Sequence, residues 1–240
     1  MNKFVGFLRF LKALFYVMFY ASNATILNLF GKGKGESYLR KRTGSAAKKL
    51  MTATGATFTI NGLENIDPSK NYVFTGNHRS YTDILVLFMI GGEANCQFTF
   101  MAKKELFKIP FLGSSMKAMH VISVDRGSTS KAMKSIIKAI ETVKEGSRNL
   151  IIFPEGTRSN DGHTLSPFKK GAFTIAKKAE VDIMPFTLEG TEIYMPKKGF
   201  GMYKANITIT FFPAISTKDK TDMEVMQETE NLIKEKLCQK

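Results

Sequence analysis

The distribution of apolar and polar residues divides the chain into an apolar N-terminal segment and a longer body. From residue 57 onward, short runs of β-branched and aromatic residues alternate with longer stretches of helical periodicity. The short runs predict strands at 57–60, 71–75, 98–101, 120–124, 149–153, 182–187 and 206–212. The longer stretches predict helices at 80–90, 128–145, 170–179 and 222–237. This alternation predicts an α/β fold with a largely parallel or mixed central sheet of about seven strands flanked by helices.

Residues 4–30 are the least polar part of the chain, and several structures fit their pattern. A secretory signal peptide would explain the small residues at 21–24, but Arg9 and Lys12 interrupt its apolar run. A membrane span needs about 20 apolar residues, and the run at 13–30 contains serine, threonine and asparagine. A helix buried in the protein core is a further alternative, although a position at the terminus suits it less well.

Basic residues flank this apolar segment on both sides, with Lys3 and Lys12 on one side and a basic stretch at 32–42 on the other. Orientation of a membrane span depends on charge asymmetry, which is small here. Cations on both flanks instead suit a helix or helical hairpin that lies in one anionic leaflet. We therefore expect an N-terminal membrane-associating helical segment at residues 1–45, a globular domain at 46–240, and a location at the cytoplasmic face of a membrane.

Composition and charge narrow the possible partners. The 240 residues are 43% hydrophobic and 23% charged, which is typical of a folded protein with one full-sized domain. The net charge of +14 predicts an anionic partner, either nucleic acid, an anionic bilayer or a phosphorylated substrate. No nucleic-acid-binding motif is present, so we expect no nucleic-acid partner. Cys96 and Cys238 form no spacing motif, which favours a reducing compartment, and His78, His120 and His163 are too scattered to predict a metal site.

Polar segments directly follow three of the predicted strands. They are Asn77-His78-Arg79, Asp125-Arg126-Gly127 and Glu155-Gly156-Thr157-Arg158. The carboxyl ends of parallel strands meet at one edge of a sheet, where ligands bind in open α/β folds. If these strands are parallel, the histidine and the two acidic residues converge on a single crevice together with Arg126 and Arg158.

His78 and Asp83 stand at the start of the helix predicted at 80–90. A helix beginning there can bring the carboxylate back to the imidazole, which would fix the tautomer and leave the other ring nitrogen as a base. The alternative is that Asp83 only caps the helix. The chain has no Gly-x-Ser-x-Gly motif, and neither cysteine is close to His78 in sequence. A base without a protein nucleophile indicates that the substrate supplies one, such as a hydroxyl group.

Cationic side chains near the same strand ends suit a phosphate group. Arg126 and Arg158 can each form paired hydrogen bonds to phosphate oxygens, and Lys103 or Lys104 can add a point charge. The alternative for each of them is an ordinary solvated surface charge. Their shared position at predicted strand ends favours the phosphate site.

Four motifs, in order along residues 55–215, resemble those of the 1-acyl-glycerol-3-phosphate acyltransferases, within the wider glycerolipid acyltransferases. The first is Asn77-His78-Arg79-Ser80-Tyr81-Thr82-Asp83, the family's His-four-residues-Asp pattern, and the second is Lys103-Lys104-Glu105-Leu106-Phe107-Lys108-Ile109-Pro110-Phe111-Leu112-Gly113, ending in Val124-Asp125-Arg126. The third is Phe153-Pro154-Glu155-Gly156-Thr157-Arg158-Ser159, followed by Phe168-Lys169-Lys170-Gly171-Ala172, and the fourth is Ile183-Met184-Pro185-Phe186. In one respect the chain departs from the family: His120 stands where glycine is usual, so we expect the local backbone to differ.

The resemblance implies that residues 46–240 are an acyltransferase domain and that His78 deprotonates the hydroxyl of lysophosphatidic acid as it attacks an acyl thioester. Asp83 would orient the imidazole, and no acyl-enzyme would form. The resemblance further implies that the acceptor phosphate is bound by Lys103, Arg126 and Arg158. Glu155 would organise the loop. The developing oxyanion would lie near Gly156 and Thr157.

The resemblance implies no cofactor, because the acyl donor, acyl-coenzyme A (acyl-CoA) or acyl-carrier protein, is a substrate. An anionic membrane surface is the expected partner, and an apolar groove or tunnel is expected to hold the acyl chain. Two other functions stay open. One is acyl transfer to another lyso-lipid, and the other is a non-catalytic basic module that binds membranes.

Overall fold

The structure is a computed structural model that describes residues 2–125, 127, 129–159 and 164–238, with only the backbone of residues 129–132. The strands are β1 (Ala56–Asn61), β2 (Tyr72–Gly76), β3 (Phe98–Lys103), β4 (Ile122–Val124), β5 (Asn149–Ile152), β6 (Asp182–Glu189) and β7 (Ala205–Phe211). The α-helices are α1 (Lys3–Leu29), α2 (Lys34–Ala53), α3 (Asp83–Glu93), α4 (Leu112–Ala118), α5 (Thr129–Lys144), α6 (Gly171–Ala179), α7 (Thr191–Tyr194) and α8 (Asp222–Cys238). Two short 3-10 helices are η1 (Leu63–Asn65) and η2 (Lys104–Lys108).

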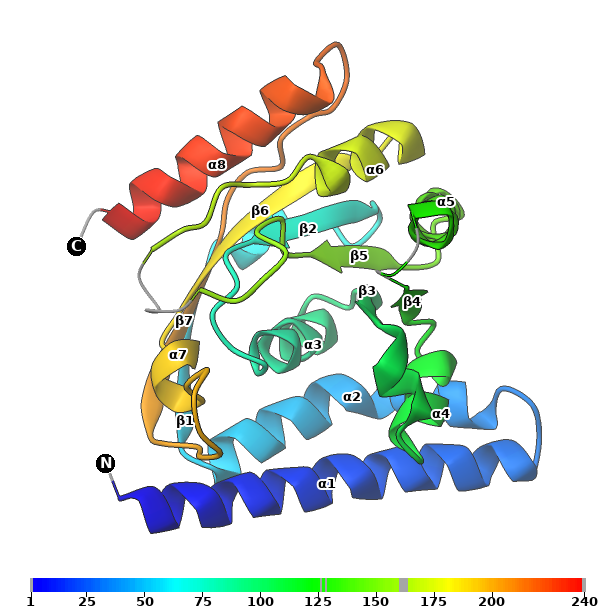
Figure 1. The fold of residues 1–240 in the computed structure, drawn as a ribbon, viewed down its shortest axis with the longest axis vertical. Coiled ribbons are helices and arrows are strands. Elements are labelled where there is room, and N and C mark those ends of the chain that lie inside the picture. The colour runs from blue at the N-terminus through cyan, green and yellow to red at the C-terminus, as the bar shows by residue number, and fades with distance from the viewer. Residues whose placement is uncertain (1, 126, 128, 160–163, 239–240) are drawn as a thin grey trace.

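The strands form one mixed sheet in the order β1-β7-β6-β2-β5-β3-β4, which confirms the predicted α/β class (Figure 1). β2 is central and pairs in parallel with both β5 and β6, while β3 and β4 continue the parallel part toward one edge. At the other edge, β7 runs antiparallel to β6 and parallel to β1. The loops after β2, β4 and β5 therefore leave the sheet on the same side, as the sequence predicts.

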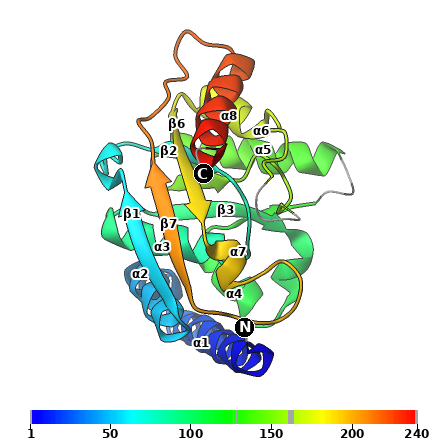
Figure 2. The ribbon, with the colours of Figure 1, turned by 90° about the vertical axis from the view of Figure 1, so that its left-hand side faces the viewer.

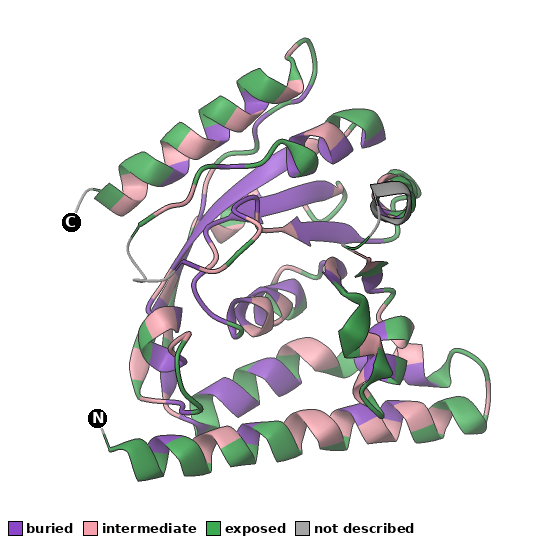
Figure 3. Cartoon of the chain, viewed as in Figure 1, coloured by how far each residue is buried: buried purple, intermediate pink, exposed green. Residues whose placement is uncertain are grey.

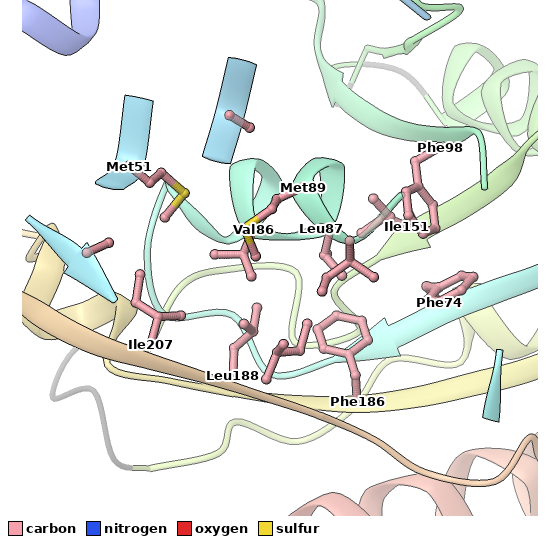
Figure 4. Packing of buried hydrophobic residues seen from close by; sticks show 14 of the residues in the cluster. Met51, Phe74, Val86, Leu87, Met89, Phe98, Ile151, Phe186, Leu188 and Ile207 are labelled. Carbon is pink, nitrogen blue, oxygen red and sulfur yellow. The ribbon is translucent and has the colours of Figure 1, made fainter. Parts of the chain in front are cut away.

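Alternation along the central strands distributes their side chains between two helical layers. Val73 and Ile183 pack with α5, α6 and α8 on one face of the sheet. Phe74 and Met184, their immediate neighbours in sequence, pack on the opposite face against α3 and α2. Figure 4 shows this second cluster, where strand residues meet the side chains of α3. Burial on both faces explains why the central strands read as nearly continuous apolar runs.

Two predicted boundaries are wrong, because a helix and a strand each begin two or three residues later than predicted. The helix predicted from residue 80 begins at Asp83, since the backbone before it wraps around the Asp83 carboxylate. The strand predicted from residue 120 begins at Ile122. His120 has φ of 58° in the left-handed region, which a strand does not use.

The left-handed conformation of His120 is one that glycine favours, so the backbone here takes a shape unusual for histidine. Its side chain gains an ion pair, with Nε2 lying 3.0 Å from Glu36 Oε1, and Arg148 contacts the same oxygen at 2.8 Å. Burial acts to raise the pKa of Glu36, but its hydrogen bonds and attraction to His120 and Arg148 outweigh this and lower it. Through these two contacts, Glu36 connects α2 to the segments just before β4 and β5.

The N-terminal segment is one continuous helix, α1, rather than a hairpin within residues 4–30. The chain turns at residues 30–33, and α2 then packs along α1. Gly35 of α2 lies so close to α1 that an added Cβ would be 2.2 Å from the Ala24 carbonyl oxygen. The expected division between residues 45 and 46 falls inside α2, which continues into the core with Leu50 and Met51. α1 is long and apolar enough to cross a membrane by length and composition alone.

Candidate active site

The candidate catalytic loop leaves the carboxyl end of β2 and is fastened to the neighbouring strand. Asn77 is buried, and its side-chain amide both donates to the Leu188 carbonyl at 2.7 Å and accepts from the Leu188 N–H at 2.8 Å. The His78 carbonyl accepts from the Ser159 N–H at 2.9 Å. These bonds tie the loop to β6 and to the segment after β5, so the backbone of His78 is held from two sides.

The structure brings His78 and Asp83 into direct contact. His78 Nδ1 lies 2.7 Å from Asp83 Oδ2, which also accepts from the N–H groups of Arg79 at 2.7 Å and Ser80 at 2.9 Å. The Asp83 side chain is fully buried, whereas that of His78 is 20% exposed. A carboxylate held by three donors fixes the ring position and favours the tautomer of the neutral imidazole in which Nδ1 carries the proton and Nε2 can accept one.

Two residues after β5 hold His78 from the other side. The ring of Phe153 stacks on the imidazole, with centroids 4.0 Å apart and planes 11° from parallel. Glu155 is buried, and its Oε1 accepts from the His78 N–H at 2.7 Å while Oε2 accepts from the Ser166 N–H at 2.9 Å. Glu155 therefore links its own loop to the loops that contain His78 and Ser166, and it does so through their backbone N–H groups.

The Arg158 side chain lies over Tyr81, in the loop that follows β2. Its guanidinium carbon lies 3.5 Å from the centroid of the Tyr81 ring, and its carbonyl accepts from Lys197 Nζ at 2.7 Å. The Nη1 atom of Arg158 is buried and has no hydrogen-bond partner among the described residues. A buried cationic donor without a partner is unfavourable unless a ligand completes it, so this atom is a candidate donor to an anion.

The remaining predicted residues are more scattered. Lys103 is an exposed residue at the carboxyl end of β3, which β5 separates from β2. Asp125 follows the edge strand β4 and pairs with Lys104 at 3.4 Å, while Arg126 lies outside the described residues. The predicted convergence thus holds for His78, Glu155 and Arg158, but Asp125 stands at the edge of the sheet.

Gly156 and Thr157 form the turn that separates Glu155 from Arg158. Gly156 has φ of 71°, and an added Cβ would lie 2.9 Å from Lys169 Nζ, so glycine suits both the conformation and the space. The Gly156 N–H donates to the Phe153 carbonyl at 3.1 Å, which uses this donor inside the turn. Thr157 is exposed.

An apolar cavity of about 210 Å³ lies between α1, α2, α3, α4 and β3. Its lining reaches Ile84 and Leu85, the two residues that follow Asp83 in the first turn of α3. A second cavity of about 280 Å³ shares Leu39, Thr43, Phe88 and Met119 with the first, and its lining mixes charged residues of α2 with apolar residues such as Met89 and Phe98. The apolar cavity therefore lies beside the first turn of α3 and adjoins a cavity that carries charged residues.

Sequence reasoning assigned no role to several residues that shape this site. Tyr81 and Phe153 belong to recognised motifs, but nothing local indicates that their rings cover Arg158 and His78. Lys197 comes from an irregular loop without any pattern. Within the described residues, no group of three or more His, Cys, Asp or Glu side chains is gathered as metal ligands would be.

Comparison with known proteins identifies the family of the chain. A sequence profile of the acyltransferase family matches residues 57–189. The chain is 40% identical over 144 residues to a chloroplastic 1-acyl-sn-glycerol-3-phosphate acyltransferase, BAT2, of Brassica napus, covering 60% of this chain and 40% of that protein. It is 34% identical over 224 residues to the 1-acyl-sn-glycerol-3-phosphate acyltransferase of Saccharomyces cerevisiae, covering 90% of this chain and 72% of that protein.

The crystal structure of the 1-acyl-sn-glycerophosphate (LPA) acyltransferase PlsC from Thermotoga maritima has the same fold. It superposes with a TM-score of 0.84 over 99% of this chain and 96% of that chain, at 24% sequence identity. The chain spans about two fifths of the length of the chloroplastic relatives it matches, at 40% and 39%. The profile covers more than half of the chain, and the yeast relative is matched over most of both sequences. The chain therefore belongs to the acyltransferase family, among the 1-acyl-sn-glycerol-3-phosphate acyltransferases.

Proposed function

We propose that this chain transfers a fatty acyl group from an acyl thioester to the sn-2 hydroxyl of 1-acyl-glycerol-3-phosphate, giving phosphatidic acid. The observation that carries the proposal is the 2.7 Å contact between His78 Nδ1 and the buried Asp83 carboxylate. This contact leaves Nε2 as a base at a partly exposed ring. Family membership supports the reaction type, and the anion position at Arg158 supports a phosphorylated acceptor.

In the proposed reaction the acceptor hydroxyl oxygen attacks the thioester carbonyl carbon while its proton passes to His78 Nε2. Asp83 stabilises the imidazolium that forms, as a carboxylate behind a catalytic histidine does in other enzymes. Collapse of the tetrahedral intermediate breaks the carbon–sulfur bond, and the departing thiolate takes the proton from Nε2. The histidine ends neutral, no acyl group is attached to the protein, and no cofactor is consumed.

The acceptor phosphate is proposed to bind at Arg158. Tyr81 supports the guanidinium from one face, and the unpartnered Nη1 supplies a donor for a phosphate oxygen. Lys103 and Arg126 remain proposed additional cations, from the loops after β3 and β4. Gly156 is proposed to shape the oxyanion region through its turn rather than through its own N–H, with Thr157 beside it.

The apolar cavity next to α3 is proposed to hold an acyl chain. Its walls are almost entirely apolar, and it begins at the first turn of the helix that carries Asp83. Continuation beyond Phe88 and Met119 would bring hydrocarbon against the charged lining of the second cavity, which is unfavourable. The length of the apolar part therefore limits the chain that fits.

Association with one leaflet of an anionic membrane, at its cytoplasmic face, is also proposed. α1 buries small residues, including Ala13, Ala21 and Ala24, and exposes large apolar ones, including Phe4, Phe15 and Leu29 at 69%, 74% and 81%. Figure 3 shows few buried positions along this helix. Because α1 packs lengthwise against α2, it suits an interfacial position better than a span. Sedimentation with anionic vesicles checks this location.

The donor is proposed to be acyl-CoA or acyl-carrier protein, both of which are anionic and arrive from water. The positive charge of the chain complements either one. An enzyme at the interface meets the lipid acceptor from the bilayer and the thioester from solution.

Arg158→Ala is expected to raise the KM for lysophosphatidic acid by roughly 10- to 100-fold, because hydrogen bonds to a charged group contribute about 1.5–3 kcal/mol. The value of kcat is expected to change less. The measurement is acceptor-dependent kinetics in detergent micelles. Monoacylglycerol, which lacks the phosphate, is expected to show no difference between Arg158→Ala and the unmodified chain.

The matched control is Arg42→Ala, which removes an arginine that lies over Tyr38 on α2, 5.4 Å from the ring centroid. This variant is expected to keep the normal KM. An unchanged KM for lysophosphatidic acid in Arg158→Ala would remove the phosphate role from Arg158. If Arg158→Ala raises the KM equally for a lysophospholipid that has no phosphate monoester, the alternative of acyl transfer to another lyso-lipid would be favoured.

A further inference from the structure

Residues 106–111, which comprise the end of η2 and the turn before α4 and are called the turn below, present apolar side chains to solvent. Leu106, Ile109 and Phe111 are 39%, 41% and 43% exposed. No catalytic step proposed above uses these three side chains. Exposed apolar residues scattered singly are ordinary in proteins, but three within one short turn form a local surface.

The turn is anchored to the domain by packing and by a tight backbone hydrogen bond. Phe107 and Leu112 face inward and pack with Met116 in a small cluster under the turn. The Leu112 N–H donates to the Pro110 carbonyl at 2.6 Å across Phe111, whose φ of 59° and ψ of −46° describe a strained γ-turn. Gly113 is required beside it, because an added Cβ would lie 2.0 Å from the Phe107 carbonyl oxygen.

The turn lies beside the exposed apolar face of α1. α4 packs directly against α1. Figures 1 and 2 show α4 and its preceding turn next to α1 on the same side of the molecule, with α8 on the opposite side. The apolar surface of α1 and that of the turn can therefore meet the same plane.

Cations surround the turn. Lys103, Lys104, Lys108 and Lys117 are all exposed, and Glu105 is the acidic residue among them. Lys104 pairs with Asp125 at 3.4 Å, which leaves most of this positive charge for other partners. Apolar tips ringed by lysine match the boundary of an anionic leaflet, where hydrocarbon lies just below negative headgroups.

We propose that residues 106–111 are a second membrane-inserting element, which enters an anionic leaflet alongside α1. The inference rests on the proposed function, since it assumes that the chain works at a membrane. α4 continues from the turn and forms part of the wall of the apolar cavity, with Leu112 and Met116. Insertion of the turn places this wall at the bilayer, so a lipid chain passes between α1 and α4 without crossing water.

Single tryptophan reporters test the inference directly, because the chain contains no tryptophan. Three variants of the full chain are compared: Ile109→Trp in the turn, Phe15→Trp on α1 and Met223→Trp on α8. Met223 is the matched control, being an apolar residue 53% exposed on the opposite side of the molecule. Each is mixed with vesicles of phosphatidylcholine and phosphatidylglycerol, with or without bromine on the acyl chains.

The expected result is a shift of emission to shorter wavelength and quenching by brominated chains for Ile109→Trp and Phe15→Trp, with neither for Met223→Trp. If only Phe15→Trp responds, the turn stays in water and the inference is overturned while membrane association stands. If neither responds, both are overturned. A response from Met223→Trp equal to that of Ile109→Trp would indicate unspecific adsorption and also overturn the inference.

Ile109→Asp extends the test to function. Loss of one isoleucine that the proposal buries in the bilayer is expected to weaken vesicle binding by roughly tenfold, and to slow acyl transfer on vesicles in proportion. Transfer to acceptor dispersed in detergent micelles is expected to stay normal, and Met223→Asp is expected to change neither. Loss of activity in micelles by Ile109→Asp would overturn the inference, whereas inactivity of the unmodified chain in every assay would count against the proposed function alone.

Discussion

His78→Ala is expected to lower kcat for acyl transfer by about 10²–10⁴-fold, which is the usual contribution of a positioned general base. The reason is that the hydroxyl must lose its proton as it attacks, and in the proposed scheme Nε2 of His78 is the group that accepts it. The measurement is kcat for phosphatidic acid formation by the purified variant at saturating concentrations of both substrates.

The matched control is His120→Ala. His120 also pairs with a carboxylate, that of Glu36 at 3.0 Å, but the pair connects α2 to the domain away from the catalytic loop. This variant is expected to keep kcat within a few-fold while losing some stability. A kcat for His78→Ala within about tenfold of the unmodified value would show that another group takes the proton.

Asp83→Asn is expected to lower kcat by roughly 10²–10⁴-fold, because an amide neither stabilises the imidazolium nor enforces the Nδ1–H tautomer. It is also expected to lower the free energy of unfolding by about 1–3 kcal/mol, since Oδ2 accepts from the N–H groups of Arg79 and Ser80 at a fully buried position. Urea unfolding and kcat are measured on the same preparation.

These two measurements distinguish a catalytic carboxylate from a helix cap. If Asp83 only stabilises the start of α3, kcat per folded molecule stays normal once unfolding is taken into account. Asp125→Asn is the control, because Asp125 pairs with Lys104 at the surface and no catalytic role is proposed for it. A normal kcat for folded Asp83→Asn would show that catalysis by His78 does not depend on the Asp83 carboxylate.

The central strands were predictable because burial on both faces leaves an almost continuous apolar run. β2 and β6 are buried along nearly their whole length, and turn residues bound each of them. α2 was not predicted, since its buried stripe contains Ala46, Ala47 and glycine among many lysines and arginines. η2 and α4 are too short for a helical repeat, and the γ-turn between them depends on tertiary packing.

The His78–Asp83 contact was predictable because it is local: the loop and the first turn of α3 bring the two together. The neighbouring contacts are not local. Tyr81 meets Arg158, and Phe153 meets His78, only because β2 and β5 are adjacent in the sheet. No spacing along the chain encodes that adjacency, so a sequence motif can name these residues without indicating which ring covers which side chain.

The most direct test of the proposed function follows both products of one reaction. The purified chain is incubated with 1-acyl-glycerol-3-phosphate and an acyl thioester, while thiol release and phosphatidic acid are quantified together and the protein is weighed by mass spectrometry. We predict one phosphatidic acid per thiol released, with no acylated protein when the acceptor is omitted. Thiol release without diacyl product, or an acyl group covalently attached to the chain, would contradict direct transfer with His78 as the base.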